Sequence, residues 1–357
     1  MSSCVVLFSG GLDSTLAARV LLNQGIVVLG LNFVTPFHDA SDIAKEQAAE
    51  LGIELIVYRT GDDYIKLISN PQWGYGKAVN PCVDCRIEMC RVAGKIMKER
   101  NADFVATGEI AGQRPNSQMQ HQLSLIARES GLCGFLVRPL TAAVLEQTEA
   151  EKLGLVNRSR LFGYTGRGRG HLVALAKRLG IKKIPQPSTG CHLCEKSYEP
   201  RVRDLFKYES NPSNWDAEIL NAGRQIRLDP ILYNFKLNEK TENEKILNEK
   251  KLKAVVARNE KQCHTLELLY NNSDARPAIL FMPESFNAPT AMIIGIDNLD
   301  DDILKIGEAL VMEFTNLQKN IQKNKIIKIK YGNKTNPAEL LYQCQNTNKK
   351  KYKWENL

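Results

Sequence analysis

Short apolar runs alternate with helical patterns through the first hundred residues of the chain. Four runs have strand character: Val5–Phe8, Val27–Phe33, Glu54–Tyr58 and Phe104–Gly108. Three segments carry apolar residues at helical spacing: Thr15–Leu22, Ser41–Leu51 and Cys85–Arg100. This alternation predicts an α/β fold, a doubly wound parallel sheet with helices on both faces. Ligands of such sheets bind beyond the carboxyl ends of the strands, so the residues after each run are candidate site residues.

The pattern becomes less regular further along. Leu123–Ala127 reads as a short strand and Thr141–Leu153 as a helix. Beyond a polar stretch, three more strands and one helix are predicted: Ala278–Met282, Met292–Ile296, Ile326–Tyr331 and Asp301–Thr315. With 357 residues, the chain is long enough for two domains. We predict a nucleotide-binding domain at 1–205, a linker at 206–215 and a smaller basic α/β domain at 216–357.

Composition narrows the class of protein. Hydrophobic residues make up 43% of the chain, enough for packed cores. No apolar run approaches the ~18 residues that a membrane span needs. The N-terminus runs straight into the first strand, without a basic region followed by an apolar stretch and a cleavage site. We therefore expect a cytoplasmic protein without a membrane partner. The sequence does not indicate the oligomeric state.

The net charge is concentrated at one end. Residues 319–357 contain ten Lys and only two acidic residues, Glu339 and Glu355. Their net charge of +8 equals the net charge of the whole chain. Near the terminus, Lys349, Lys350, Lys351 and Lys353 are interleaved with Tyr352 and Trp354. Lysines mixed with aromatic residues are typical of nucleic-acid contacts. The basic end therefore predicts an RNA-binding segment, and a solvated tail is the alternative.

The segment Ser9-Gly10-Gly11-Leu12-Asp13-Ser14 lies between the first strand and the first helix. Backbone N–H groups at a helix N-terminus have no intrahelical partner and face the positive end of the helix dipole. Two glycines let the main chain approach an anion closely, and two serines add hydroxyl donors. This composition predicts a phosphate-binding loop, and a glycine-rich turn with an N-cap is the alternative. Because the Asp13 carboxylate would repel phosphate, we expect a bridging Mg²⁺.

Two further strand ends contribute candidate ATP-binding residues. Phe33 ends the second strand, and Thr107 and Gly108 end the fourth. A glycine-rich loop at 163–170 lacks the spacing and the preceding strand of a dinucleotide fingerprint. Its Arg167 and Arg169 precede a predicted helix, where they could bind RNA phosphates. A structural turn is the competing interpretation.

The nine cysteines include two Cys-x-x-Cys pairs, Cys82/Cys85 and Cys191/Cys194. Disulfides are rare in the cytoplasm, so clustered cysteines favour metal or redox chemistry. The spacing within each pair is that of a metal knuckle. Thiolates bind both zinc and iron–sulfur clusters. We predict that Cys82, Cys85 and Cys191 hold one [4Fe–4S] cluster with a free fourth iron. Cys194 is the alternative ligand, which would close the site around Zn²⁺.

Four motifs occur in an informative order: SGGLDS at 9–14, NPCVDC at 80–85, ATG at 106–108 and PSTGC at 187–191. SGGLDS resembles the PP-loop of the ATP pyrophosphatase superfamily, which cleaves ATP between the α and β phosphates. Together the motifs resemble the tRNA thiouridylases, the 2-thiouridylase family first and the 4-thiouridine synthetases next. The resemblance covers about residues 1–205. It implies that Cys85 and Cys191 are the catalytic cysteines. As the lone carboxylate of the loop, Asp13 is the third candidate catalytic residue, with a role in ATP cleavage.

The implied reaction replaces a uridine carbonyl oxygen of tRNA with sulfur. ATP adenylates that oxygen, pyrophosphate leaves, and a sulfur nucleophile displaces AMP. The sulfur comes from sulfide or from a persulfide carrier protein. Two features depart from the 2-thiouridylases: Cys191 follows Gly190 directly, and the family's Lys-Asp-Gln-Ser motif is missing near 130–145. The C-terminal part resembles a small RNA-binding domain of ribosome-quality-control proteins instead of the family's β-barrels. The modified position in tRNA therefore stays open.

Two other functions compete with thiolation. A PP-loop synthase acting on a small molecule, with a structural Cys4 zinc site, would leave the basic C-terminal end unexplained. A non-enzymatic RNA-binding module would leave SGGLDS unexplained. ATP-to-AMP turnover together with bound tRNA separates the three possibilities.

Overall fold

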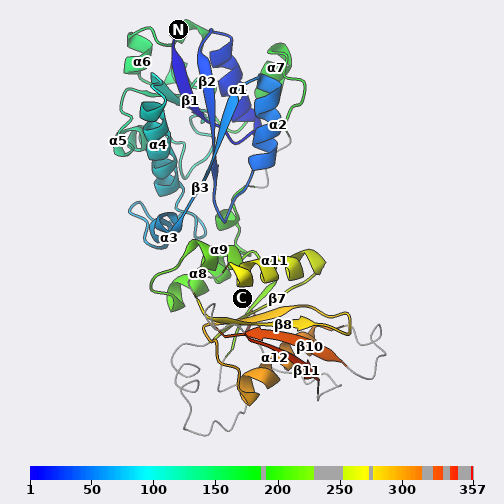
Figure 1. The fold of residues 1–357 in the computed structure, drawn as a ribbon. Coiled ribbons are helices and arrows are strands. Elements are labelled where there is room, and N and C mark those ends of the chain that lie inside the picture. Colours follow the sequence, from blue (N-terminus) through cyan, green and yellow to red (C-terminus); the bar gives the residue numbers. More distant parts are fainter. Residues whose placement is uncertain are drawn as a thin grey trace. The chain divides into compact units, whose positions relative to one another are not determined.

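The computed structural model describes residues 1–185, 190–228, 252–272, 276–315, 325–332, 338–344 and 355–356. The chain divides into two compact units, Met1–Glu199 and Pro200–Leu357 (Figure 1). Within the described ranges, no helix combines the length and the hydropathy that a membrane span requires.

The first unit contains the predicted parallel sheet. Its strands are β1 (Ser3–Leu7), β2 (Val27–Val34), β3 (Glu54–Arg59), β4 (Phe104–Thr107) and β5 (Leu136–Val137). All pair in parallel, in the order β3-β2-β1-β4-β5. The chain therefore builds outward from β1 in one direction with β2 and β3, and in the other with β4 and β5. The carboxyl ends of β1 and β4 flank the point where the order reverses, which is where ligands of such sheets bind.

The helices of the first unit are α1 (Leu12–Leu22), α2 (Ser41–Leu51), α3 (Asp62–Ser69), α4 (Cys82–Glu99), α5 (Gln120–Glu129), α6 (Glu149–Lys152) and α7 (Gly170–Arg178). Helices α1, α2 and α7 lie along one side of the sheet, and α4 and α5 along the other (Figure 1). Phe8, Leu16, Leu21 and Phe104 are fully buried in the core between the sheet and α1. The predicted fold class is thus confirmed, with helices on both faces of a parallel sheet.

Two predicted elements are wrong. The segment Leu123–Ala127 lies in helix α5. Its Leu123, Leu125 and Ala127 alternate as in a strand, but the buried residues Leu123 and Ile126 are three positions apart, as on one face of a helix. The predicted helix Thr141–Leu153 is interrupted because Leu145 is extended. A short 3-10 helix, Ala142–Val144, and α6 remain. The start of α6 is fixed by Thr148, which accepts a hydrogen bond from the Glu151 N–H, while the Glu151 carboxylate accepts one from the Thr148 N–H.

The second unit is an antiparallel sheet with helices. Its strands are β6 (Arg224–Arg227), β7 (Lys253–Val256), β8 (Ala278–Pro283), β9 (Ala291–Ile294), β10 (Ile326–Tyr331), β11 (Ala338–Gln343) and β12 (Glu355–Asn356). They are ordered β11-β10-β8-β9-β7-β6-β12. Its helices are α8 (Glu199–Tyr208), α9 (Asn214–Ile219), α11 (Glu260–Asn271) and α12 (Asp301–Glu313). Alternate residues of the central strands enter two separate apolar clusters, so both faces of the sheet are covered.

The boundary between the units differs from the predicted linker at 206–215. Helix α8 overlaps the start of that stretch, and its Asp204 is buried against the sheet of the second unit. Both Asp204 oxygens accept hydrogen bonds from Arg227 of β6, at 2.8 and 2.9 Å. A buried bidentate ion pair of this kind ties α8 to the sheet. The polar composition of 206–215 therefore reflects a helix end and a cap, and the division lies at Glu199.

Candidate functional site

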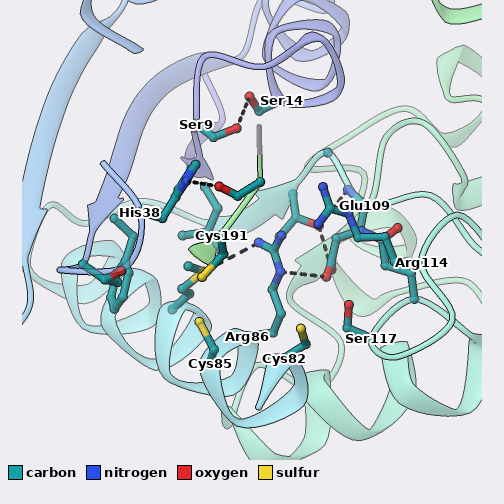
Figure 2. Close-up of a pocket in the computed structure, with 18 of the residues that line it drawn as sticks. Ser9, Ser14, His38, Cys82, Cys85, Arg86, Glu109, Arg114, Ser117 and Cys191 are labelled. Atoms are coloured by element: carbon teal, nitrogen blue, oxygen red, sulfur yellow. Dashed lines mark hydrogen bonds and ion pairs between the residues drawn. The ribbon is translucent and has the colours of Figure 1, made fainter. Parts of the chain in front are cut away.

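A cavity of about 210 Å³ opens at the carboxyl edge of the parallel sheet. Most of the predicted ATP and cysteine residues line it: Ser9, Asp13, Ser14, Phe33, Thr107, Gly108, Cys82, Cys85, Cys191 and Cys194. Figure 2 shows Ser9 and Ser14 at one end of this space, and Cys82, Cys85 and Cys191 at the other. The fold thus brings the predicted phosphate-binding loop and both cysteine pairs, which are far apart in sequence, onto one cavity.

The loop between β1 and α1 has the geometry of an anion cradle. Gly10 has a φ of 72°, and a Cβ there would come within 2.7 Å of the Ala44 backbone, so only glycine fits. Gly11 is the N-cap of α1 and has no side chain with which to cap the helix. The hydroxyls of Ser9 and Ser14 lie 3.3 Å apart. The first-turn N–H groups of α1 are therefore left for an anion, with two hydroxyls beside them.

Gly108 packs directly against this loop. A Cβ on Gly108 would lie 2.5–2.6 Å from backbone atoms of Asp13 and Ser14. The end of β4 can therefore approach the first turn of α1 only with glycine at this position. The glycine at position 108, which was predicted to bind ATP, is thus required by the packing of β4 against α1.

Asp13 lies in the first turn of α1 and lines the cavity. Its Oδ2 accepts a hydrogen bond from Gln113 Nε2 at 3.1 Å. Burial raises the pKa of Asp13, and Gln113, Arg114 and Arg169 oppose that shift. The carboxylate is thus held in place at the mouth of an anion-binding loop, where a divalent cation would stabilise its charge.

Each sulfur of the first cysteine pair has a polar neighbour. The Asn80 amide Nδ2 donates to Cys82 Sγ at 3.2 Å. Asn80 Oδ1 accepts from the Ala78 N–H at 3.1 Å, and this bond turns the amide nitrogen toward the sulfur. The Tyr64 hydroxyl lies 3.1 Å from Cys85 Sγ. Donors aimed at sulfur stabilise a thiolate over a thiol.

The four thiols differ in acidity. A hydrogen bond from Cys194 is the largest influence on Cys82, and with Asn80, Arg86 and Arg114 it lowers the pKa of Cys82 to about 6 against the effect of burial. Burial raises the pKa of Cys85, and it raises the pKa of Cys191 to about 12. The Cys194 pKa is raised because its proton is held by Cys82. Cys82 therefore has the lowest pKa of the four thiols, whereas the family resemblance implies Cys85 and Cys191 as the catalytic cysteines.

The arrangement is not a ready-made metal site. In the part of the chain that the structure describes, no three His, Cys, Asp or Glu groups are placed so that they could hold a metal ion. The chemistry of the donor set nevertheless suits a thiophilic metal, since four thiols from two segments share one cavity.

Several cavity residues were not predicted from the sequence. They are His38, Tyr64, Asn80, Arg86, Glu109 and Arg114. Arg86 directly follows Cys85, and its Nε lies 3.7 Å from Glu109 Oε1, while the other Glu109 oxygen accepts from Arg138 Nε at 3.1 Å. Position next to a Cys-x-x-Cys pair is the one sequence signal that could have indicated Asn80 and Arg86. Nothing local marks His38 or Glu109.

The predicted RNA-binding residues fall in different surroundings. Arg167 is exposed, whereas Arg169 is partly buried and donates to the Pro185 carbonyl. Arg169 therefore also anchors the chain ahead of the second cysteine pair. The lysines Lys349, Lys350, Lys351 and Lys353 lie outside the described residues.

The acidity of Cys82 gives a direct prediction. In metal-free protein, we expect alkylation of Cys82 by iodoacetamide to rise through pH values near its pKa of about 6, because the thiolate is the nucleophile. Cys191 should react only at much higher pH. Peptide mass spectrometry over a pH series from acid to mildly alkaline measures both rates. In a Cys194→Ala variant, the Cys82 midpoint should move up toward the ordinary thiol value of about 8.5. An unshifted midpoint would show that Cys194 does not stabilise the thiolate.

Comparison with known proteins confirms the resemblance over the N-terminal part. Residues 1–154 match the family described as "Thiamine biosynthesis protein (ThiI)". A tRNA-specific 2-thiouridylase MnmA of Pelobacter propionicus is 35% identical over 120 residues, 30% of this chain and 33% of that protein. A probable tRNA sulfurtransferase of Mycoplasmopsis pulmonis is 32% identical over 146 residues, 38% of this chain and 36% of that protein.

These similarities are partial. The chain spans about a third of the length of the curated relatives that it matches. Among solved structures, a 4-thiouridine synthetase–RNA complex with bound ATP is similar, with a TM-score of 0.37 and 21% identity. The similarity covers 61% of this chain and 52% of the other. The part matched by the family model contains the phosphate-binding loop and the first cysteine pair of the N-terminal unit.

Proposed function

We propose that this protein is an ATP-dependent tRNA sulfurtransferase that thiolates a uridine. The observation that carries the proposal is the single cavity whose wall holds both the Ser9–Ser14 loop and the four cysteines. An ATP-cleaving loop beside clustered thiols suits a reaction in which adenylation is followed by sulfur transfer. The matched relatives are a 2-thiouridylase and a probable tRNA sulfurtransferase. An enzyme that acts on tRNA is expected in the cytoplasm.

In the proposed first step, a uridine carbonyl oxygen attacks the α-phosphorus of ATP, and pyrophosphate leaves. Ser9, Ser14 and the N–H groups at the start of α1 would bind the phosphates as charge develops on them. Asp13 would hold a Mg²⁺ ion, which supplies charge neutralisation when bound. Phe33, Thr107 and Gly108, at the adjoining strand ends, would surround the rest of the nucleotide.

In the proposed second step, sulfur attacks the activated carbon, the C–S bond forms, and AMP leaves with the former carbonyl oxygen. Cys82, Cys85 and Cys191 would hold a [4Fe–4S] cluster, and Cys194 is the alternative fourth ligand in a zinc site. When bound, such a cluster supplies an iron with an open position for sulfur. Asn80 and Tyr64 would orient the sulfurs of Cys82 and Cys85. The sulfur donor would be sulfide, or a persulfide carrier from which a thiol reductant releases the outer sulfur as sulfide while the thiols are oxidised to a disulfide.

The function is tested with purified protein, tRNA, ATP, Mg²⁺ and sulfide under anaerobic conditions. We expect AMP and pyrophosphate formation that depends on tRNA, and a thiolated uridine in nucleoside mass spectrometry of the product. The competing small-molecule synthase would release AMP without any thionucleoside in the tRNA. ATP turnover that is indifferent to tRNA would therefore contradict the proposal.

The basic C-terminal end should contribute to tRNA affinity. Replacing Lys349, Lys350, Lys351 and Lys353 with Ala should weaken binding, because fewer neutralised phosphates release fewer counterions. The slope of log affinity against log salt should flatten by roughly 0.7 to 0.9 for each phosphate that is no longer neutralised. A filter-binding titration from about 50 to about 200 mM salt measures both the affinity and the slope.

The control for this experiment is a double variant, Lys45→Ala with Lys95→Ala, which removes two exposed lysines of the first unit. Its affinity and salt slope should equal those of wild type. If replacing the four C-terminal lysines also leaves the slope unchanged, the basic end is a solvated tail.

A further inference from the structure

The second cysteine motif is held in the cavity by a turn from a distant part of the chain. This turn, Thr35–His38, directly follows β2. Its ends bind each other, since the Thr35 N–H donates to the His38 carbonyl at 3.0 Å and the His38 N–H donates to the Thr35 carbonyl at 3.1 Å. The Phe37 N–H also donates to the Thr35 hydroxyl at 3.2 Å. The turn is thus a fixed extension of a central strand.

Two hydrogen bonds join this turn to the residues on either side of Cys191. His38 Nδ1 lies 3.1 Å from the carbonyl oxygen of Gly190. Because a carbonyl oxygen can only accept, Nδ1 carries the proton and donates. The His192 N–H donates to the Phe37 carbonyl at 3.1 Å. Figure 2 shows the His38 bond beside Cys191.

Through these two hydrogen bonds, the segment around Cys191 is attached to the end of β2. Gly190 has a φ of 89°, a left-handed conformation that a side chain rarely adopts, so the chain turns sharply just before Cys191. The fully buried Phe37 contacts Tyr198 edge to face, and Tyr198 stacks on His192. The Phe37 side therefore has aromatic support, whereas the Gly190 side is held by the His38 imidazole.

We propose that His38 is a positioning residue that, through the Gly190 carbonyl, holds the Cys191 thiol toward Cys82 and Cys85. His38 itself lines the cavity, as do Gly190 and Cys191. The proposal deepens the proposed function, because it names what brings the second cysteine motif to the sulfur site. It concerns the geometry of the thiol, so it can be tested without any assay of tRNA.

The test compares His38→Leu with His38→Asn in the full-length, metal-free protein. Leucine removes the donor and keeps comparable bulk. Asparagine keeps a donor, since its Nδ2 lies at the same distance along the side chain as His Nδ1. His121→Leu, which replaces an exposed histidine on α5, is the matched control. The rate of Cys191 alkylation by iodoacetamide is measured by peptide mass spectrometry, with the exposed Cys133 as internal reference.

We expect His38→Leu to raise the rate of Cys191 alkylation by about fivefold. Losing one ordinary hydrogen bond increases by about that factor the fraction of molecules in which the Cys191 segment is detached from the turn and its thiol is accessible. His38→Asn and His121→Leu should stay within about twofold of wild type, a margin below that effect. An unchanged rate in His38→Leu would overturn the proposal. Equal alkylation rates in His38→Leu and His38→Asn would also overturn the proposal, because a hydrogen-bond donor at position 38 would then make no difference to Cys191.

A second readout ties the positioning role to the proposed reaction. His38→Leu should lower tRNA thiolation while ATP affinity stays at the wild-type value, and His38→Asn should restore thiolation. If wild-type protein does not thiolate tRNA at all, the proposed function fails, and the alkylation comparison still decides the role of His38. If circular dichroism shows that His38→Leu is unfolded, His38→Gln is used instead. The glutamine amide nitrogen lies at the position of His Nε2 and not of Nδ1, so it does not replace the donor to Gly190.

Discussion

Replacing Asp13 with Ala should reduce AMP and pyrophosphate formation by about 10³-fold, the scale seen when one charge-stabilising group is lost from a preorganised site. Asp13 is the lone carboxylate in a loop otherwise built for anions, and burial already raises its pKa. A carboxylate in this position helps to bind phosphates only if a cation bridges the two. The measurement is tRNA-dependent release of AMP from labelled ATP.

The matched control for Asp13→Ala is Asp42→Ala. Asp42 is an acid in the first turn of α2 with an almost fully exposed side chain, and it forms an ion pair with the exposed Lys45. Its loss should leave turnover unchanged. Circular dichroism should show that both variants are folded. Wild-type turnover in Asp13→Ala would rule out the proposed magnesium role.

Cys191→Ala should abolish binding of iron and thiolation together, whereas Cys194→Ala should retain both. The reason is the number of ligands. A [4Fe–4S] cluster held by Cys82, Cys85 and Cys191 leaves one iron open, and a fourth protein ligand would close it. The protein is purified anaerobically, and its iron, sulfide and zinc contents are measured. We expect about four irons per chain in wild type and in Cys194→Ala.

One outcome would contradict the cluster. Stoichiometric zinc without iron, lost in Cys194→Ala as well as in Cys191→Ala, would mean a closed structural site and would contradict the cluster. Cys133→Ala is the control for loss of a thiol, because Cys133 is exposed and does not line the cavity. Its metal content and activity should equal those of wild type.

The cysteine experiment also addresses the low pKa of Cys82. Cys194 is the main cause of that low value in metal-free protein. If Cys194→Ala slows thiolation while the iron content is retained, Cys194 acts on the sulfur chemistry through Cys82 and not as a ligand. The alkylation profile of Cys82 in the same variant shows whether its acidity has changed.

The sequence by itself determined the elements that depend on local pattern. The apolar runs and helical spacings placed β1 to β4, α1, α2 and α4 close to their observed bounds. SGGLDS marked the loop after β1 because its composition is needed for close approach to an anion, whatever the rest of the fold. Local pattern was insufficient where two periods coincide over a few residues, as in α5, or where a capped turn interrupts a helical pattern, as before α6.

Only the tertiary structure decided which distant groups meet. Parallel strands put Ser9, Phe33 and Thr107 at one edge, and this much follows from strand order. The influences that give Cys82, Cys85 and Cys191 different acidities come from Cys194, Tyr64 and burial, none of which has a fixed sequence distance from the thiol. The His38–Gly190 hydrogen bond joins residues 152 positions apart. Such interactions depend on how loops leave the sheet, and a one-dimensional pattern does not contain that information.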